Sequence, residues 1–192
     1  HSFAMFEPFF TGHSITGYGM GLSSAAGVAP ISAQRPLATV GDGGFWHNGF
    51  LSGVTSAVKN EADSVLLVFK NGYTSATGTQ ELVSTPLAAA REDAGGASTT
   101  ATDRSIERVL EGVGVKWLRT VHSYDVKRMQ STLAEAFTTR EPGLKVVVAE
   151  GECQLERQRR LQPFIARKEA AGARTARQRY GIAEDLCSGH HA

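Results

Sequence analysis

Residues 37–44 of the 192-residue chain read LATVGDGG, a short apolar run that ends in a turn of three glycines and one aspartate. The apolar run lies between Pro36 and Gly41, which is typical of a buried β-strand over Leu37–Val40. The residues that follow, to about Asn60, carry apolar side chains at spacings of three and four. These apolar residues are Phe50, Leu51, Val54, Ala57 and Val58. The stretch therefore predicts a strand, a tight turn and a helix.

The same alternation of strands and helices continues along the chain. Apolar runs predict three further strands, over Ser64–Phe69, Val115–Val121 and Leu144–Ala149. Helices are predicted over Leu22–Val28, over Asp103–Leu110 with Asp103 as a candidate N-cap, and over Asp125–Thr138. The last of these helices carries Val126, Met129, Leu133 and Phe137 at helical spacing. We therefore expect an α/β fold, a doubly wound, mostly parallel sheet with helices on both faces.

The bulk composition fits an ordinary globular core. Hydrophobic residues make up 41% of the chain, and the formal net charge of +1 gives no global indication of binding to nucleic acid or to a membrane. No apolar run approaches the roughly 20 residues that a bilayer crossing requires. The first ten residues lack the pattern of a signal peptide, so Cys153 and Cys187 are expected to be reduced thiols of a cytoplasmic protein.

Two parts are expected along the chain. Residues 1–153 form the predicted α/β domain, in which Leu82–Thr102, rich in small residues, is expected to be a mobile excursion. Residues 154–192 form a basic helical tail with many arginines over Glu156–Tyr180. The tail is interpreted as a solvated helix face or a docking segment, or else as a patch for nucleic acid or an acidic partner. Because the chain begins at His1 and stops without a helix end, we expect it to be part of a longer protein.

The strongest chemical signal is the pairing of Asp42 with Asn71. Each directly follows a predicted strand, and parallel sheets bind ligands where the carboxyl ends of their strands meet. A carboxylate and an amide oxygen are hard ligands that suit Mg²⁺, with phosphate oxygens completing the coordination. Gly41, Gly43 and Gly44 let backbone amides approach a diphosphate at the positive end of the following helix. A Gly-Asp-Gly sequence alone is also a common turn, but Asn71 after the next strand favours a metal–diphosphate site.

This pattern resembles the thiamine-diphosphate motif of decarboxylases and oxidoreductases. The resemblance implies that Asp42, Asn71 and the backbone carbonyl of Tyr73 hold Mg²⁺. Many members have a second asparagine after the first, where this chain has Gly72. That departure points away from pyruvate decarboxylase and towards the 2-oxoacid:acceptor oxidoreductases.

A longer match points to the indolepyruvate ferredoxin oxidoreductases within that family. It is carried by residues 41–49 (GDGGFWHNG), 71–78 (NGYTSATG) and 150–155 (EGECQL), and the similarity covers nearly the whole chain. The second stretch adds Thr74 and Ser75 to the cofactor-binding residues that the resemblance implies. The implied reaction is the oxidative decarboxylation of indolepyruvate or another aryl 2-oxoacid. The implied partners are coenzyme A as acyl acceptor and ferredoxin or another electron acceptor.

The resemblance also implies parts outside this chain. Residues 187–192 resemble the junction to a cysteine-rich iron–sulfur segment, so a cluster is expected only in the longer protein, with Cys187 as a candidate ligand. In this cofactor class a glutamate of a separate pyrimidine-binding domain contacts the aminopyrimidine, so the chain alone is expected to be catalytically incomplete. Related enzymes build the cofactor site between two domains, and we therefore expect a homo-oligomer.

The glycine-rich turn before the first helix has two interpretations. Gly17, Gly19, Met20 and Gly21 are candidates for the wall against the thiazolium and pyrimidine rings, as the corresponding turn is in similar enzymes. Alternatively, they only start a helix, with Met20 in the core. His13, in the polar turn before them, is a candidate catalytic residue that faces the substrate carboxylate or oxygen, or else a solvated histidine.

Three further candidate residues lie near the predicted strand ends. His47 and Asn48 follow the glycine turn and are candidates for phosphate contacts, or else they cap the helix at the surface. Cys153 follows a strand end and is expected to be buried rather than reactive.

Two rival functions stay open. The first is another 2-oxoacid oxidoreductase or a non-oxidative decarboxylase. The second, of a different class, is a non-catalytic scaffold whose basic tail docks a partner or nucleic acid. A steep fall of nucleic-acid affinity with salt would favour the scaffold.

Overall fold

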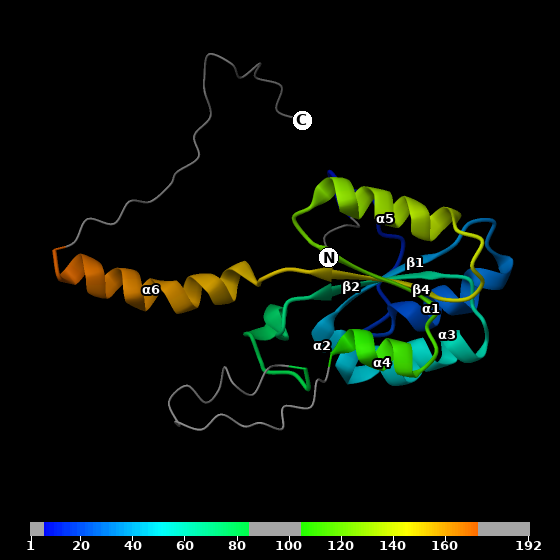
Figure 1. The fold of residues 1–192 in the computed structure, drawn as a ribbon, viewed down its shortest axis with the longest axis horizontal. Coiled ribbons are helices and arrows are strands. Elements are labelled where there is room, and N and C mark those ends of the chain that lie inside the picture. The colour runs from blue at the N-terminus through cyan, green and yellow to red at the C-terminus, as the bar shows by residue number, and fades with distance from the viewer. Residues whose placement is uncertain (1–5, 85–104, 173–192) are drawn as a thin grey trace, which may run out of the picture. The chain divides into compact units, whose positions relative to one another are not determined.

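The computed structural model describes residues 6–84 and 105–172. The chain divides into two compact units, residues 1–156 and 157–192, and each is described by itself. The described residues of the first unit form one sheet of four parallel strands in the order β1-β2-β4-β3 (Figure 1). The strands are β1 (Leu37–Gly41), β2 (Val65–Lys70), β3 (Trp117–His122) and β4 (Lys145–Glu150). The predicted α/β class and parallel sheet are confirmed.

Helices flank and connect these strands. Before β1 lie α1 (Gly21–Val28) and the 3₁₀ turn η2 (Ala29–Ile31). After β1 the chain is helical from Asp42 to Lys59, as α2 (Asp42–Gly44), the π-helix η3 (Phe45–Val54) and α3 (Thr55–Lys59). After β2 come the 3₁₀ turn η4 (Ser75–Thr77), α4 (Ile106–Gly112), α5 (Val126–Thr138) and α6 (Gln154–Ala170).

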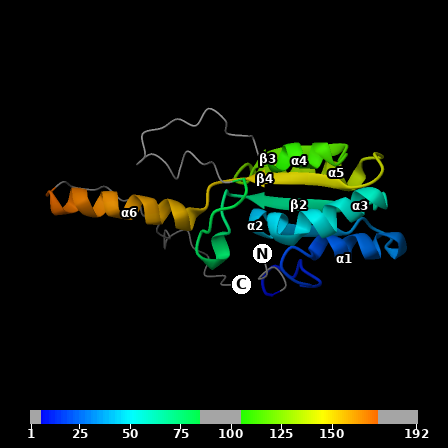
Figure 2. The ribbon, with the colours of Figure 1, turned by 90° about the horizontal axis from the view of Figure 1, so that it is seen from below.

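The strand order explains why helices cover both faces of the sheet. The connections from β1 to β2 and from β2 to β3 advance in one direction across the sheet, whereas β3 to β4 returns. Parallel crossovers are almost always right-handed, so a connection that reverses direction passes over the opposite face. Accordingly α5 covers one face, while α1, α3 and α4 lie on the other (Figure 1). Figure 2 views the sheet from the side of these three helices.

The core has one layer on each face of the sheet. Residues of β2 and β4 alternate between the layers, because successive side chains of a strand point to opposite faces. One layer contains Leu66, Val68, Val146 and Val148, and the other contains Val65, Leu67, Val147 and Ala149. Both faces of these two strands are covered, which is why their sequences are continuous apolar runs.

The helix after the glycine turn departs from the predicted pattern. Residues 45–54 form a π-helix, in which hydrogen bonds span five residues instead of four. The wider turn changes which residues face the core, so a spacing rule based on 3.6 residues per turn fails here. Leu51 is 71% exposed, and Gly49 and Gly53 are buried in this helix. Of the apolar residues at helical spacing, Leu51 is therefore exposed, whereas Val54 and Ala57 are buried.

The apolar face of α5 is narrower than its sequence pattern predicted. Met129 and Leu133 pack against the core, but Val126 is 72% exposed and Phe137 is 40% exposed. α5 packs chiefly against β3 and β4, the two strands at one side of the sheet. Val126 and Phe137 lie in the first and last turns of α5, and both stay exposed although they share the helical spacing of Met129 and Leu133.

The second half of the domain begins later than the sequence predicted. α4 starts at Ile106, and its N-cap is Ser105, whose hydroxyl accepts the backbone N–H of Arg108 at 3.2 Å. β3 likewise starts after the beginning of its apolar run. The candidate N-cap Asp103 and residues 85–102 of the expected excursion lie outside the described residues.

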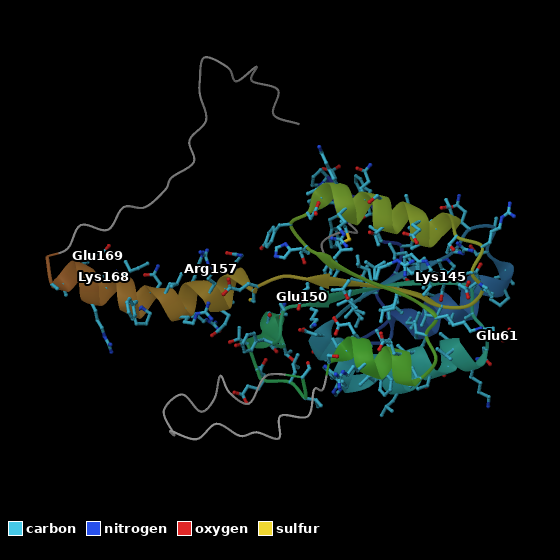
Figure 3. All side chains as sticks on the ribbon, viewed as in Figure 1. Glu61, Lys145, Glu150, Arg157, Lys168 and Glu169 are labelled. Atoms are coloured by element: carbon cyan, nitrogen blue, oxygen red, sulfur yellow. The ribbon has the colours of Figure 1, made fainter. Side chains whose placement is uncertain are left out.

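Most of α6 belongs to the second unit. No residue of α6 is buried, and its basic side chains are Arg157, Arg159, Arg160, Arg167 and Lys168. Figure 3 labels the first and last of these. The remainder of the expected basic stretch, from residue 173, lies outside the described residues, so the role of the tail stays a prediction. None of the helices in the described part of the chain combines the length and the apolarity that a bilayer crossing requires.

Candidate functional site

The structure brings Asp42 and Asn71 together at the carboxyl edge of the sheet. They follow β1 and β2, which pair in parallel with Gly41 opposite Phe69. The backbone N–H of Asn71 donates to Asp42 Oδ2 at 2.8 Å, and the N–H of Gly72 donates to the same oxygen at 2.6 Å. The expected approach of the two strand ends is therefore confirmed.

Asp42 is a buried carboxylate held by backbone amides. Its side chain is 1% exposed, and its Oδ1 accepts the N–H of Gly43 at 3.0 Å. Burial raises the pKa of this carboxyl, while the amides of Asn71, Gly72 and Gly43 work against the rise. No side-chain cation of the described residues forms an ion pair with Asp42. A buried carboxylate without a cation is costly, and a bound metal ion would compensate it.

The loop after β2 places further oxygen atoms beside Asp42. Asn71 Oδ1 accepts the N–H of Tyr73 at 3.1 Å and the hydroxyl of Ser75 at 2.9 Å, which fixes the amide beside Asp42. The loop closes through the N–H of Thr74, which donates to the carbonyl of Gln80 at 2.9 Å. The described residues contain no cluster of three or more His, Cys, Asp or Glu side chains. The donors are thus one carboxylate, one amide and backbone carbonyls, a set that suits Mg²⁺ rather than zinc.

Two hydroxyl groups converge on Gly43, and we call this position the cradle. A Cβ atom on Gly43 would lie 2.5 Å from Tyr18 Oη and 2.5 Å from Thr74 Oγ1. A side chain at position 43 would therefore collide with both hydroxyls, and glycine lets them lie this close to the backbone. The cradle lies directly after Asp42, so the residues present fit a metal-bound diphosphate.

The glycine-rich turn packs tightly against the helix that follows Asp42. Gly19 has a positive φ of +78°, and a Cβ atom there would overlap the carbonyl oxygen of Gly44. Met20 is the N-cap of α1 and is 41% exposed, so its interpretation as a core residue is wrong. Gly17 is exposed beside Met20, and a Cβ on it would lie 3.2 Å from the Met20 sulfur. Whether this turn forms the wall against the cofactor rings stays a prediction.

Three other candidates have different surroundings. His13 is exposed, and no described hydrogen bond links it to Asp42 or Asn71, so its catalytic role stays a prediction. His47 is exposed, and its ring centroid lies 5.3 Å from that of Tyr18. Asn48 accepts a hydrogen bond from Ser52 within the helix at 2.7 Å.

Cys153 lies after β4 and is only partly buried, so its expected burial is wrong. Partial burial raises the pKa of its thiol, but the hydroxyl of Ser75 and the amides of Glu156 and Leu155 lower it overall. Ser75 thus contacts both Cys153 and the amide of Asn71. Sequence reasoning missed this contact, because its partners lie on two different loops.

A second missed feature is an ionic cluster next to Asn71. Lys70 Nζ lies 2.8 Å from Glu107 and 3.2 Å from Glu150. Burial works to lower the pKa of Lys70, but the two carboxylates raise it overall. The cluster joins the ends of β2 and β4 to the start of α4. Nothing in the local sequence around Lys70 indicates this ionic cluster, since Glu107 lies in α4, which is distant along the chain.

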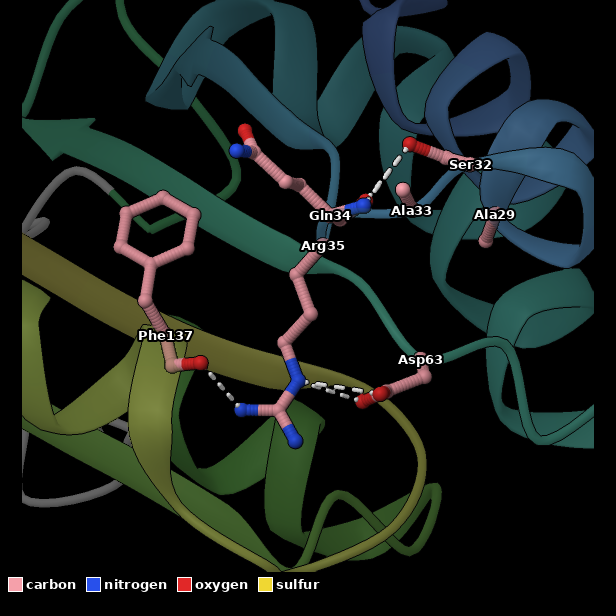
Figure 4. A pocket seen from close by; sticks show the side chains of 7 residues that line it. All are labelled: Ala29, Ser32, Ala33, Gln34, Arg35, Asp63 and Phe137. Atoms are coloured by element: carbon pink, nitrogen blue, oxygen red, sulfur yellow. Dashed lines mark hydrogen bonds and ion pairs between the residues drawn. The ribbon is translucent and has the colours of Figure 1, made fainter.

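The amino edge of the sheet holds a pocket of about 480 Å³ (Figure 4). Figure 3 labels Lys145 and Glu150 at the two ends of β4, and the pocket lies at the Lys145 end. Its charged lining residues are Arg35 and Asp63, which form an ion pair at 2.9 Å. Arg35 Nη1 also donates to the carbonyl of Phe137 at 2.8 Å. The charged groups that line this pocket pair within the chain, so we interpret the pocket as structural. It lies at the opposite edge of the sheet from Asp42.

Comparison with known proteins identifies the class of protein. Residues 3–148 match the family model described as the C-terminal TPP-binding domain of thiamine pyrophosphate enzymes. The match covers most of the chain, and the chain belongs to this family.

The individual relatives are more specific. The chain is 33% identical over 139 residues to the indolepyruvate oxidoreductase subunit IorA of Archaeoglobus fulgidus, over 72% of this chain and 20% of that protein. It is 26% identical over 148 residues to the same subunit of Methanothermobacter thermautotrophicus, over 77% of this chain and 22% of that protein. The chain therefore spans about a fifth of the length of these curated relatives. Among solved structures, the benzoylformate decarboxylase of Polynucleobacter necessarius aligns with a TM-score of 0.48 and 20% identity, over 71% of this chain and 24% of that one.

Proposed function

We propose that this chain is the diphosphate-binding part of an enzyme that oxidatively decarboxylates indolepyruvate or a related aryl 2-oxoacid to the acyl-CoA. Membership of the thiamine pyrophosphate enzymes supports the cofactor. Similarity to IorA subunits supports an oxidoreductase that acts on an indole-bearing 2-oxoacid. The complete enzyme would use coenzyme A, and an iron–sulfur cluster outside this chain would pass electrons to ferredoxin or another acceptor.

The observation that carries the proposal is the buried carboxylate of Asp42. It is 1% exposed, lies beside Asn71 and has no side-chain cation among its described neighbours. An ionised group in that position needs a compensating charge, and Mg²⁺ bound to a diphosphate supplies it. Asp42, the amide oxygen of Asn71 and the carbonyl of Tyr73 would hold the metal.

The other residues of the site would bind and orient the cofactor. Backbone groups of Gly41, Gly43 and Gly44 lie where a diphosphate can approach the start of a helix. Ser75 fixes the Asn71 amide through its hydroxyl, and Thr74 lines the cradle over Gly43. The turn Gly17–Met20 would border the rings of the cofactor, and His13 would face the substrate.

Thiamine diphosphate, when bound, supplies the carbanion-stabilising chemistry that decarboxylation of a 2-oxoacid requires. This chain holds the diphosphate end, and the glutamate that contacts the aminopyrimidine would come from another domain. The complete protein is therefore expected to assemble as a homo-oligomer. A strict monomer in light scattering of the active protein would contradict this part of the proposal.

The first test is calorimetric titration of thiamine diphosphate into the complete natural protein, with Mg²⁺ and then with EDTA. We expect saturable binding with Mg²⁺ that EDTA abolishes. Binding that is equal in the two solutions, or absent from both, would contradict the proposed metal–diphosphate site.

The second test addresses the substrate. With coenzyme A and oxidised ferredoxin, indolepyruvate should give acyl-CoA, carbon dioxide and reduced ferredoxin faster than pyruvate does. Release of carbon dioxide and an aldehyde without any electron acceptor would instead identify a non-oxidative decarboxylase. Faster turnover of pyruvate would identify a different 2-oxoacid oxidoreductase.

A further inference from the structure

Tyr18 lies outside the residues that the motif defines, yet its phenol reaches the site. It is the second residue of the turn Gly17–Met20, which is closed by the N–H of Met20 donating to the carbonyl of Gly17 at 3.3 Å. Its hydroxyl lies 2.5 Å from the point that a Cβ atom on Gly43 would occupy. The phenol therefore borders the backbone directly after Asp42.

A second hydroxyl meets it there. Thr74 Oγ1 also lies 2.5 Å from that point, and it comes from the loop that carries Asn71 and Tyr73. Two hydroxyl groups from segments far apart in the sequence thus converge over one glycine. Within the described part of the chain, neither hydroxyl makes a hydrogen bond, so each is available to donate to a ligand oxygen.

The position of Tyr18 is fixed by backbone packing. Gly19, the next residue, has a φ of +78°, and its Cα face lies against the carbonyl of Gly44 with no room for a side chain. Such a positive φ at the third position of a tight turn favours glycine. The ring of Tyr18 also packs against that of His47, with 5.3 Å between centroids and planes tilted by 54°. The backbone of Tyr18 is therefore placed before any ligand binds and its ring has a packing partner, which lowers the entropic cost of using the hydroxyl.

These groups suit an anionic oxygen. The cradle combines two hydroxyl donors with the backbone at the start of the helix that follows Asp42, and hydrogen bonds to a charged acceptor are the stronger ones. We propose that Tyr18 is a cofactor-anchoring residue, whose hydroxyl, with that of Thr74, donates hydrogen bonds to phosphate oxygens of thiamine diphosphate bound over Gly43. This inference rests on the proposed function, because it takes that cofactor as the ligand.

The experiment is calorimetric titration of thiamine diphosphate, with Mg²⁺, into the complete natural protein and its variants. Tyr18→Phe removes the oxygen and keeps the ring and its contact with His47. We expect it to weaken binding about tenfold, the order expected when a hydrogen bond to a charged group is lost. Thr74→Val should act in the same direction. Tyr124→Phe is the matched control, since Tyr124 is similarly exposed and its hydroxyl accepts from Gln154 instead, and it should bind as the wild type does.

The outcomes separate the two proposals. If Asp42→Ala loses binding while Tyr18→Phe binds as the wild type does, the role of Tyr18 is wrong and the proposed function stands. If the wild type shows no Mg²⁺-dependent binding, the proposed function fails and the inference fails with it. Equal weakening by Tyr18→Phe and Tyr124→Phe, or a lower unfolding midpoint of Tyr18→Phe, would show a general or structural effect and overturn the inference.

Discussion

The two edges of the sheet hold their carboxylates in opposite ways. At the carboxyl edge, Asp42 is buried and bound by three backbone N–H groups. At the amino edge, Asp63 is half exposed and pairs with Arg35 and with Lys145. Burial raises the pKa of Asp42, with only amides to oppose it. Burial also works to raise the pKa of Asp63, but Lys145 and Arg35 lower it overall.

The difference separates an edge whose charges are paired within the chain from the edge at which we propose the metal site. Arg35 pairs with Asp63 and also bonds the end of α5. Its Nη1 donates to the carbonyls of Ala136 and Phe137 at 3.1 and 2.8 Å. The charges of the amino edge are thus compensated within the chain, as Figure 4 shows for Arg35. The charge of Asp42 has no such partner among the described residues, which suits an edge that binds a cation from solution.

The largest effect is expected from Asp42→Ala. Removing the only carboxylate of the proposed metal site should weaken binding of thiamine diphosphate at least about a thousandfold, measured by calorimetry with Mg²⁺. Asp125→Ala is the matched control, because Asp125 also accepts a backbone N–H, that of Arg128 at 3.0 Å, but as the N-cap of α5. It should cost about 1 kcal/mol of stability and leave the affinity unchanged. Unchanged affinity in Asp42→Ala would break the assignment of the carboxyl edge as functional.

At the amino edge, Asp63→Ala should act on stability instead. It leaves the ammonium of Lys145, which is 0% exposed, without its carboxylate. We expect a loss of about 3 kcal/mol in the free energy of unfolding, measured in urea, with cofactor affinity unchanged. The double variant Asp63→Ala/Lys145→Met should recover most of the loss, because no buried charge remains. A loss below about 1 kcal/mol would mean that the pair contributes like an ordinary surface ion pair.

Two glycines with nearly equal φ test the edges directly. Gly19 has a φ of +78° and no room for a Cβ, whereas Gly143, before β4, has a φ of +79° and no atom within 4 Å of one. Gly143→Ala should cost about 1 kcal/mol of stability for the backbone conformation alone, and it should leave cofactor binding unchanged. Gly19→Ala should cost more, because it must also displace the turn that carries Tyr18, and it should weaken binding. Equal results for the two variants in unfolding and in calorimetry would contradict the tight packing of that turn.

The smallest effect is expected in the pH dependence of stability. The pKa of Asp63 is lowered below its ordinary value of 3.8, so its contribution is complete above that value and is lost as the pH falls through the folded pKa. Because Asp63 is 51% exposed, solvent screens its charge, and the protonated carboxyl still accepts a hydrogen bond from Lys145, which alanine cannot do. We therefore expect less than about 1 kcal/mol, well below the loss in Asp63→Ala. The measurement is the free energy of unfolding of the wild type and of Asp63→Asn between about pH 5 and pH 2. A difference between the two proteins that grows as the pH falls would contradict the sign.

The sequence by itself determined the fold class and the centre of the site. Apolar runs and their spacing are local, so they predicted the four strands and placed Asp42 and Asn71 directly after two of them. Parallel strands then required these two residues to meet, and the hydrogen bond between them is observed. The roles of these residues in binding the cofactor stay proposals.

Only the tertiary structure decided which groups meet at the two edges of the sheet. The sequence did not predict the π-helix that exposes Leu51, because its wider turn has no signature in a 3.6-residue pattern. It did not place Tyr18 over Gly43 or pair Asp63 with Lys145. These contacts join segments that are distant along the chain, and their energies depend on packing and burial that no local pattern records. The sequence therefore predicted the strands and turns, whereas the partners of each charged group and hydroxyl could be identified only in the folded chain.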